Sequence, residues 1–391
     1  MANKNKEKKQ RKPIVRVLLW IANVVIAAIL LVVLICAGGL TYLSVTEFKP
    51  EDVETVEIDT SETSGEKLTA DSGFTIMTWN AGYGALGDNA DFFMDGGTGV
   101  QTATKERVEV NLSSIASLAE SNAPDVVFFQ EVDRDSKRSY NINECDYIKD
   151  AMSTDYVSTF ANNFKVNYVP YPVPTIGKVD SGVFTLSKYE INDAKRISLP
   201  CPFSWPVRTA NLKRCLLVSR VPVYDADGND TGKELVLVNL HLEAYDSGEG
   251  KKAQTDQLKS LLEDEYEKGN YVIAGGDFNQ KFSNIDTSMY PEYEGMWQCG
   301  EIDSNEFSEK WQLMMDSNAP TCRSLDKPYA NADKDTFQYY MIDGFIVSDN
   351  IEIESCETLD YHFAGTDHNP VVMKVNLKNE NTESDDNTES E

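Results

Sequence analysis

The chain has 391 residues, of which 41% are hydrophobic and 10% aromatic, a composition typical of a folded protein with a substantial core. Its formal net charge is −28, which excludes broad, non-specific binding to nucleic acid, because such binding depends on Lys and Arg that neutralise phosphates. The charge does not exclude hydrolysis of a nucleic acid, since a metal ion and a small basic patch can handle a few phosphates. The seven cysteines show neither a CxxC pair nor zinc-ligand spacing, and Cys215, in an apolar run, is predicted to be a buried free thiol.

The N-terminus predicts one membrane-spanning helix. Residues 1–16 are strongly basic, and residues 17–43 contain no charged residue, which is long enough to cross a bilayer. Basic flanks stay in the cytoplasm, so we expect 1–16 to be a cytoplasmic tail and everything after residue 43 to lie outside. A cleaved signal peptide and a lipoprotein signal are the alternatives. The apolar segment is long for either, no small-x-small cleavage site follows it, and no small residue precedes Cys36, so the sequence favours a retained signal anchor over 17–43.

Two acidic segments flank the remaining chain. Residues 44–72 are rich in acids, Ser and Thr and poor in apolar residues, which predicts a solvated linker. Residues 378–391 have no apolar side chain and are predicted to form a disordered acidic tail, with partner binding as the alternative role. The catalytic domain is therefore expected between them, at 73–377.

Strands and helices alternate through this domain. Helices are predicted at Lys105–Glu120 and Lys251–Lys268, where apolar residues recur at helical spacing. Short apolar runs predict strands at Phe74–Trp79, Asp125–Phe129, Gly182–Leu186, Leu212–Val221, Glu234–Leu240, Tyr271–Ala274, Met341–Val347 and Val371–Val375. The acidic residues 225–230 are predicted to be a hairpin turn, because their acids and glycine are in the wrong order for a calcium loop. We expect an α/β fold in which two sheets pack face to face with helices outside.

The stretch Tyr271–Asn279 carries the strongest single signal. A buried strand ends in Gly275 and Gly276, which allow a tight turn or a close backbone approach, and Asp277 and Asn279 follow. An acid and an amide at the end of a buried strand are costly without a partner. A metal ion and a phosphate would supply that partner.

Five further motifs of this kind fall at or just after predicted strand ends. They are Trp79-Asn80, Gln130-Glu131, Asn239-Leu240-His241, Ile342-Asp343 and Thr366-Asp367-His368. Each motif alone is more often a helix cap or a satisfied core group than a catalytic residue. Their number and order favour the catalytic interpretation, since two of the three histidines fall inside them and only His362 does not.

In these motifs and their order the chain resembles the endonuclease/exonuclease/phosphatase superfamily, the DNase I-like fold, over roughly residues 73–377. The helix with Gln254 and Leu258 ahead of the Gly-Asp-x-Asn strand is also similar, whereas Thr366 replaces the serine of the last family motif and keeps a hydroxyl. The resemblance implies a two-sheet β-sandwich flanked by helices and a metal-dependent phosphoesterase. The apolar segment 17–43 predicts that this enzyme is membrane-anchored.

The resemblance also implies a role for each motif residue. Glu131, with Asn80 beside it, is expected to bind Mg²⁺ (Mn²⁺ and Ca²⁺ being the alternative ions), and Asp367 to bind metal or balance the charge of the site. His368 is expected to activate water, with Asp343 orienting its ring. The remaining expectations are that Asp277 orients the water, that Asn279 holds a phosphoryl oxygen, and that His241 donates to a phosphoryl oxygen or to the leaving group.

The substrate is left open by the sequence. Arg134, Lys137 and Arg138 are expected to form a phosphate-binding rim, with a solvated loop as the alternative. The aromatic, proline-containing segments Phe164–Lys178 and Pro200–Pro206 are expected to be loops that stack on a base, lie at a lipid interface or only pack. Lipid headgroups, nucleotides and nucleic acid all fit a phosphoesterase held at the outer cell surface by a bilayer anchor. An extracellular nuclease and a non-catalytic surface-binding protein are the alternatives.

Overall fold

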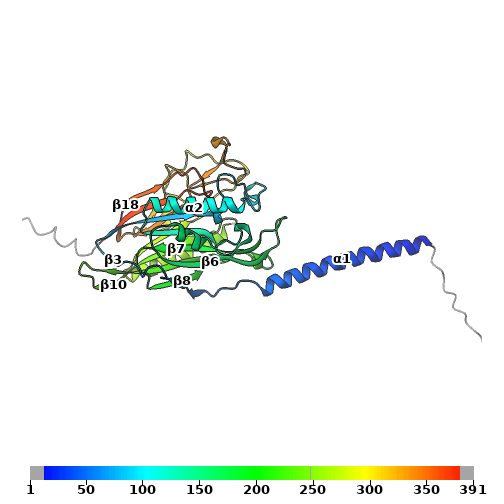
Figure 1. The fold of residues 1–391 in the computed structure, drawn as a ribbon, viewed down its shortest axis with the longest axis horizontal. Coiled ribbons are helices and arrows are strands. Elements are labelled where there is room, and N and C mark those ends of the chain that lie inside the picture. The colour runs from blue at the N-terminus through cyan, green and yellow to red at the C-terminus, as the bar shows by residue number, and fades with distance from the viewer. Residues whose placement is uncertain (1–12, 247, 379–391) are drawn as a thin grey trace, which may run out of the picture. The chain divides into compact units, whose positions relative to one another are not determined.

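The protein is described by a computed structural model that covers residues 13–246 and 248–378. The chain divides into two compact units between Glu47 and Phe48. Residues 1–12 of the predicted basic tail, and all but the first residue of the predicted acidic tail, lie outside the described residues. The order of the elements can be followed in Figure 1.

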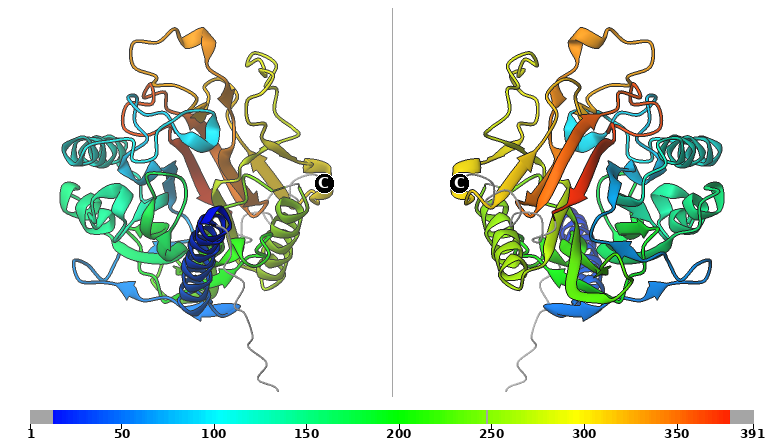
Figure 2. Two further views of the ribbon diagram at one scale, coloured as in Figure 1. Left: turned by 90° about the vertical axis from the view of Figure 1, so that its right-hand side faces the viewer. Right: turned by 90° about the vertical axis from the view of Figure 1, so that its left-hand side faces the viewer.

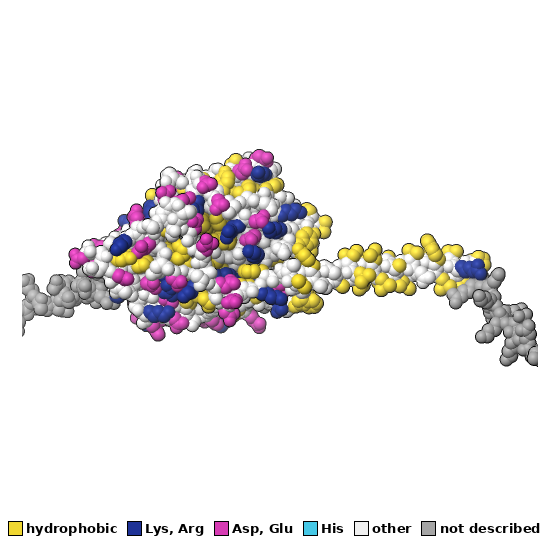
Figure 3. Space-filling model, turned by 60° about the horizontal axis from the view of Figure 1, so that its bottom comes forward, with side chains coloured by type: hydrophobic (Ala, Val, Ile, Leu, Met, Phe, Trp, Pro, Cys, Tyr) yellow, Lys and Arg dark blue, Asp and Glu magenta, His cyan; other side chains and the backbone are white. Residues whose placement is uncertain are grey.

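The first unit is one long helix, α1 (Pro13–Val45). Its 33 residues make it about 50 Å long at 1.5 Å per residue, enough to span a bilayer. Hydrophobic side chains follow one another along its surface (Figure 3), and within the described residues it is the one helix long and apolar enough to cross a membrane.

The second unit contains two large sheets. The first has the strand order β1 (Val53–Thr55), β8 (Asp193–Ser198), β9 (Cys215–Tyr224), β10 (Asp230–His241), β11 (Tyr271–Asp277), β17 (Asp343–Ser348) and β14 (Trp311–Met314), and β3 (Leu68–Thr69) pairs with β9. The second has the order β18 (Ile351–Thr358), β19 (Val371–Leu377), β4 (Gly73–Asn80), β5 (Val126–Asp133), β7 (Gly177–Ser187), β6 (Val157–Val169) and β2 (Ile58–Asp59). Two short pairs complete the strands, β12 (Gln280–Phe282) with β13 (Gly300–Ile302) and β15 (Cys322–Arg323) with β16 (Tyr339–Tyr340).

The sheets pack face to face and helices cover their outer faces. Apolar side chains of both sheets, including Phe74, Phe128 and Phe345, form the central core. The helices α2 (Lys105–Ser121) and α3 (Glu144–Ala151) pack on the second sheet, and α4 (Glu249–Glu267) packs on the first. Figure 2 shows these helices on opposite sides of the sheets. The predicted α/β sandwich with outer helices is confirmed.

Short 3-10 helices lie in the connecting loops. They are η1 (Gly82–Gly84), η2 (Phe93–Asp95), η3 (Lys137–Ser139), η4 (Val207–Ala210), η5 (Ser304–Glu306) and η6 (Lys334–Thr336). The hairpin predicted around residues 225–230 is present, because β9 and β10 pair antiparallel and the Asp225 carboxylate accepts bonds from two backbone N–H groups of that turn.

The prediction of a solvated linker over 44–72 is wrong where the chain forms the three short strands β1, β2 and β3. Strands β1 and β3 extend the first sheet and β2 extends the second. Leu68 is fully buried in the central core, and Val56 packs against the same cluster. Edge strands carry acids on their open face, so an acidic composition does not by itself indicate a linker.

The prediction that Phe164–Lys178 is a loop is also wrong in part. Strand β6 continues to Val169 and β7 begins at Gly177, so only residues 170–176 form the turn between them. All seven cysteines lie in the described part of the chain and are free, Cys215 being buried as predicted.

Candidate active site

Three site residues lie side by side on the first sheet because of its register. His241 ends β10 opposite Asp277, the last residue of β11, and Asp277 lies opposite Asp343, the first residue of β17. The close approach depends on Gly276, whose φ is 147° and whose position leaves no room for a Cβ, since one would lie 1.9 Å from the Leu240 carbonyl oxygen. A buried strand that ends in Gly-Gly-Asp therefore brings two carboxylates and an imidazole together.

The second sheet supplies the facing wall. Asn80 ends β4 opposite Gln130 of β5, and Glu131 follows with a left-handed φ of 51°. The Asn80 amide donates to Asp277 Oδ2 at 3.1 Å and approaches Glu131 Oε1 at 3.4 Å, so it connects the two walls. Its amide oxygen accepts from the Gly82 N–H at 3.0 Å. The structure thus gives Asn80 a positioning role, while its role as a metal ligand stays a prediction.

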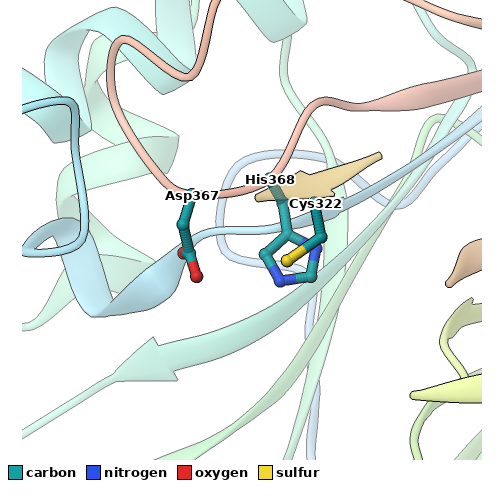
Figure 4. A group of neighbouring side chains, drawn as sticks. All are labelled: Cys322, Asp367 and His368. Atoms are coloured by element: carbon teal, nitrogen blue, oxygen red, sulfur yellow. The ribbon is translucent and has the colours of Figure 1, made fainter. Parts of the chain in front are cut away.

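The loop before β19 brings in the last motif. The Thr366 hydroxyl donates to the Asn80 carbonyl at 3.0 Å, and the Trp79 indole donates to the His368 carbonyl at 2.9 Å. These bonds fasten residues 366–368 to the end of β4. Figure 4 shows the Asp367 carboxylate and the His368 imidazole on this loop. Thr366, which replaces the serine of the family motif, therefore uses its hydroxyl to bind the end of β4.

His368 is held by Asp343 and faces Asp277. Its Nδ1 lies 2.8 Å from Asp343 Oδ2, and its Nε2 lies 3.9 Å from Asp277 Oδ2. The Nε2 of His241 lies 3.5 Å from the same Asp277 oxygen. The predicted Asp343–His368 pair is present, and both histidines converge on one carboxylate.

The electrostatics of the site push its pKa values apart. Burial raises the pKa of Asp277, and the charge of Asp343 raises it further. Burial also lowers the pKa of His241, and nearby Arg214 adds to that effect. Burial alone would lower the pKa of His368, but the Asp343 carboxylate outweighs it and raises that pKa well above its usual value. Groups tuned in opposite directions in one cleft are typical of acid–base catalysts.

Asn279 also takes up a constrained geometry. It has a left-handed φ of 51°, its N–H donates to Asp277 Oδ1 at 2.8 Å, and its amide donates to the Leu242 carbonyl at 2.9 Å. These bonds fix the side chain beside Asp277. Its expected contact with a phosphoryl oxygen stays a prediction.

The three basic residues expected at the rim do not behave alike. Arg138 turns inward, donates twice to Asp133 at 2.9 and 3.0 Å, and lies over the Tyr83 ring. It supports the base of the site, and its charge acts on Glu131. Arg134 and Lys137 are exposed, with the Arg134 guanidinium over the Phe160 ring. Only these two retain the exposure that a rim requires.

The sequence did not single out several residues that the fold brings to the site. Asp95 on η2 lies near Asp367 and Glu131, and burial together with the Asp367 charge raises its pKa to about 7. The Tyr245 hydroxyl donates to Asp95 at 3.2 Å. Cys322 lies beside His368. Neither Asp95 nor Cys322 belongs to a strand-end pattern or a spacing motif, so no local signal marked them.

A buried polar contact joins the two sheets beneath the site. The Gln130 amide on β5 donates to Asn239 Oδ1 on β10 at 2.9 Å, and Asn239 donates in turn to the Phe184 carbonyl of β7 at 3.0 Å. Both side chains are fully buried. Bonded amides of this kind fix how one sheet lies on the other, and therefore the spacing of the two walls.

The donor set fits a hard divalent cation. Burial raises the pKa of Glu131, and the neighbouring Asp367 carboxylate opposes its ionisation further. Asp343 Oδ1 is buried without a hydrogen-bond partner among the described residues. Carboxylates that repel one another in a low-dielectric cleft are stabilised by a divalent ion with oxygen ligands. Glu131 and Asp367 are the residues that would hold it.

Comparison with known proteins identifies the family. The model of the Endonuclease/Exonuclease/phosphatase family matches residues 77–380. The chain belongs to this family. It is thus an enzyme of the metal-dependent hydrolases that act on phosphoric ester bonds, and the fold is the DNase I-like fold that its motifs implied.

Solved structures resemble this chain at low sequence identity. The endonuclease/exonuclease/phosphatase from Beutenbergia cavernae is 18% identical, with a TM-score of 0.53, over 78% of this chain and 72% of that one. The endonuclease/exonuclease/phosphatase from Bacteroides vulgatus is 14% identical, with a TM-score of 0.49, over 78% of this chain and 100% of that one. The human Nocturnin catalytic domain with bound sulfate is also 14% identical, with a TM-score of 0.47, over 83% of this chain and 97% of that one. No match is found among curated protein sequences.

Proposed function

We propose that this chain is a membrane-anchored, Mg²⁺-dependent phosphoesterase that hydrolyses a phosphodiester or phosphomonoester outside the cytoplasm by in-line attack of water. The observation that carries the proposal is the convergence of His241 and His368 on Asp277, with Glu131 and Asp367 near enough that their charges act on one another. A cation at Glu131 and Asp367, with Mn²⁺ and Ca²⁺ as alternatives to Mg²⁺, would polarise the phosphoryl group and offset its negative charge.

Each side chain of the site has a separate role in the attack of water on the ester. Asp277 accepts a hydrogen bond from the attacking water and aligns it, since its carboxylate lies between the two imidazoles. His368, oriented by Asp343, exchanges the proton of that water through Nε2. His241 is kept neutral and donates one N–H to a phosphoryl oxygen or the leaving group. Asn279 supplies a further amide hydrogen to the phosphoryl group.

A matched pair of histidine variants tests the assignment. His368→Ala should lower turnover of a chromogenic bis-phosphodiester by at least about a hundredfold, the range of general-base losses. His362→Ala is the control, because His362 is the third histidine and its side chain is 82% exposed. Asp277→Ala should lower turnover at least as much as His368→Ala does. EDTA should abolish the hydrolytic activity of the unaltered chain, and added Mg²⁺ should restore it. Near-normal hydrolysis by both site variants would contradict the proposed chemistry.

The connection that follows α1 is short. Residues 46–52 join Val45 to β1, so they span at most about 25 Å when fully extended. The start of the second unit is fastened to the end of β8, because the Ser198 N–H donates to the Asp52 carbonyl at 2.8 Å. The loop that follows β8 leads to Trp205 and Val207, each 56% exposed. An apolar loop therefore follows the strand to which Asp52 is bonded.

This loop adjoins a second apolar projection near the site. Ala210, at the end of η4, packs against the same cluster as Val169 of the β6–β7 hairpin, whose turn carries Tyr171 and Val173, 68% and 91% exposed. Tyr171 contacts the ring of Phe93 on η2 with the ring centroids 5.9 Å apart, and η2 also carries Asp95 of the site. We therefore infer that the ester is presented by a lipid surface, as in a phospholipid headgroup.

A substrate panel distinguishes the sources of the ester. The full chain in proteoliposomes is assayed with sphingomyelin, phosphoinositides, plasmid DNA, RNA, nucleotides and the soluble bis-phosphodiester. Lipid hydrolysis that falls several-fold in Val173→Ser/Val207→Ser, with the soluble ester still cleaved at the same rate, supports the lipid assignment. Cleavage of DNA or RNA alone would make the chain an extracellular nuclease, and silence on every substrate would favour a binding protein on the same fold.

The orientation is tested on intact cells. With the catalytic unit outside, added protease should reach it from the medium, and hydrolysis should be detectable on unbroken cells. Because strands β1, β2 and β3 pair only residues 53–55, 58–59 and 68–69 with the sheets, the accessible backbone is expected at residues 46–52 and between these strands. Protection that persists until the cells are lysed would place the catalytic unit inside.

A further inference from the structure

A thiol lies beside the catalytic histidine without belonging to the acid–base set. Cys322 begins β15, forms an isolated β-bridge with His368, and its thiol interacts with the imidazole ring. One ligand atom from each of Cys322, Asp367 and His368 lies within 4.8 Å of the other two. Figure 4 shows the sulfur next to the ring, with the Asp367 carboxylate on the adjoining stretch of chain.

We propose that Cys322, Asp367 and His368 form an inhibitory binding site for a thiophilic divalent ion such as Zn²⁺. Sulfur, imidazole nitrogen and carboxylate oxygen are the donors that Zn²⁺ takes in proteins, whereas Mg²⁺ takes oxygen ligands. The donor set thus separates this site from the Mg²⁺ position at Glu131, although Asp367 belongs to both.

The geometry lies close to that of a three-ligand zinc site. Zinc bonds of about 2.0–2.3 Å at tetrahedral angles put ligand atoms roughly 3.5 Å apart, so separations of up to 4.8 Å require shifts on the order of 1 Å. The ring of His368 is already oriented, because its Nδ1 pairs with Asp343 at 2.8 Å and leaves Nε2 for the ion. A carboxylate on the far nitrogen is the arrangement that zinc-binding histidines use.

The thiol must lose its proton when the ion binds. Burial raises the pKa of Cys322 to about 12, so the thiol is protonated in the metal-free protein. Coordination to a divalent ion deprotonates a thiol outright and needs Nε2 of His368 without its proton, so the protons carried by both atoms are released to solvent when the ion binds. The reaction forms a metal–sulfur bond and needs no oxidant.

Occupancy of this site would stop hydrolysis, and this consequence rests on the proposed function. The ion would take Nε2 of His368, the atom that exchanges the proton of the attacking water, and the Asp367 carboxylate. Zn²⁺ should therefore inhibit at concentrations at which Mg²⁺ activates, and raising Mg²⁺ should relieve the inhibition only in part, because Mg²⁺ competes at Asp367 and not at sulfur.

Cobalt(II) provides a readout that is independent of activity. Co²⁺ replaces Zn²⁺ in such sites, and a thiolate bound to it gives a near-ultraviolet charge-transfer absorption. Added to the reduced full-length chain in detergent, Co²⁺ should produce this absorption at one equivalent, and Zn²⁺ should remove it. Cys322→Ser should abolish the band, while Cys201→Ser (an exposed thiol) and Cys215→Ser (a buried one) should retain it. A band that survives in Cys322→Ser, or no band in the unaltered chain, would overturn the proposed site.

The activity assay then tests the inhibition. Relative to each variant's own Mg²⁺-dependent rate, the Zn²⁺ concentration for half inhibition should rise at least about tenfold in Cys322→Ser and stay unchanged in the two cysteine controls. Equal inhibition of all variants would overturn the inhibitory role. If the chain has no hydrolytic activity, the cobalt spectrum still decides whether the site exists, and a circular dichroism spectrum establishes that Cys322→Ser is folded.

Discussion

Two buried clusters of charge lie on the same sheet and are built differently. At the start of β10, Arg220 donates to both carboxylate oxygens of Glu265 at 2.6 and 2.9 Å and to Glu234 at 2.8 Å. Burial would raise the pKa of Glu265, but these bonds outweigh it and lower that pKa to about 2. At the other end of β10, the pKa of Asp277 is raised by burial and by Asp343, and Asp343 Oδ1 has no partner among the described residues.

The difference separates a structural cluster from a functional one. In the Arg220 cluster the ionised forms stabilise one another, and Lys268 and Asn270 supply further bonds to Glu265. In the Asp277 cluster like charges are held together in a low-dielectric cleft, at a cost to the free energy of folding. Such a cost is recovered only when a ligand binds, so the second cluster is the one poised for chemistry.

The largest expected change in turnover comes from replacing the Asp277 carboxylate by an amide of the same shape. Asp277→Asn should lower turnover by at least about a hundredfold because the amide orients water poorly. In EDTA it should also raise the melting temperature by a few degrees, since the repulsion from Asp343 is removed and about 1 kcal/mol shifts Tm by that amount. Steady-state kinetics and thermal unfolding of one preparation measure both. A variant with lowered stability would contradict the interpretation of this cluster.

The same replacement in the structural cluster should have the opposite outcome. Glu265→Gln should lower the free energy of unfolding by about 2 kcal/mol, because Arg220, which is partly buried, would lose the carboxylate that it bonds twice and keep only Glu234 at hydrogen-bond distance. Turnover should not change, since Glu265 is on α4 and bonds to Arg220 near the start of β10, whereas the site lies at the end of β10. Urea unfolding at pH 7 measures the loss, and a hundredfold loss of turnover would show that the two clusters are coupled.

Acid titration sharpens this second prediction. The pKa of Glu265 is about 2 in the folded chain and near 4.5 in the unfolded chain. Its contribution to the free energy of unfolding is therefore fully present above pH 4.5 and is lost as the pH falls toward 2. The stability difference between the unaltered chain and Glu265→Gln should therefore shrink across that window. A difference that stays constant with pH would mean that the amide disturbs packing instead of charge.

The smallest effect is expected at the rim. Lys137→Ala should raise KM about two- to fivefold with kcat unchanged, because an exposed lysine contributes little beyond attraction of the phosphate. Lys105→Ala, at a partly exposed surface pair with Glu109, is the control. Raising the salt concentration should erase the Lys137 effect. An unchanged KM at low salt would exclude Lys137 from the phosphate-binding rim.

The sequence by itself determined the long apolar helix, the sandwich and the polar residues at the strand ends. Charge-free apolar runs of membrane length and short apolar runs closed by Gly, Asp, Asn or His are local signals, because burial sets which residues a strand accepts and which ones end it. Asp277 and Asn279 stood out in this way, as did His368 beside Asp367. The residues expected to form the acid–base set are the ones that the structure brings together.

Only the tertiary structure decided how those residues are used. The register of β10, β11 and β17 set the order His241–Asp277–Asp343, and Asn80 became the bond between the two walls. Arg138 turned inward because Asp133 pairs with it, and Cys322 reached His368 from a strand with no motif. In the acidic segment before β4, strands β1, β2 and β3 likewise form because they pair with β8, β6 and β9. Contacts between distant segments depend on which strands pair and on which side chains meet, and the local pattern of residues predicts neither.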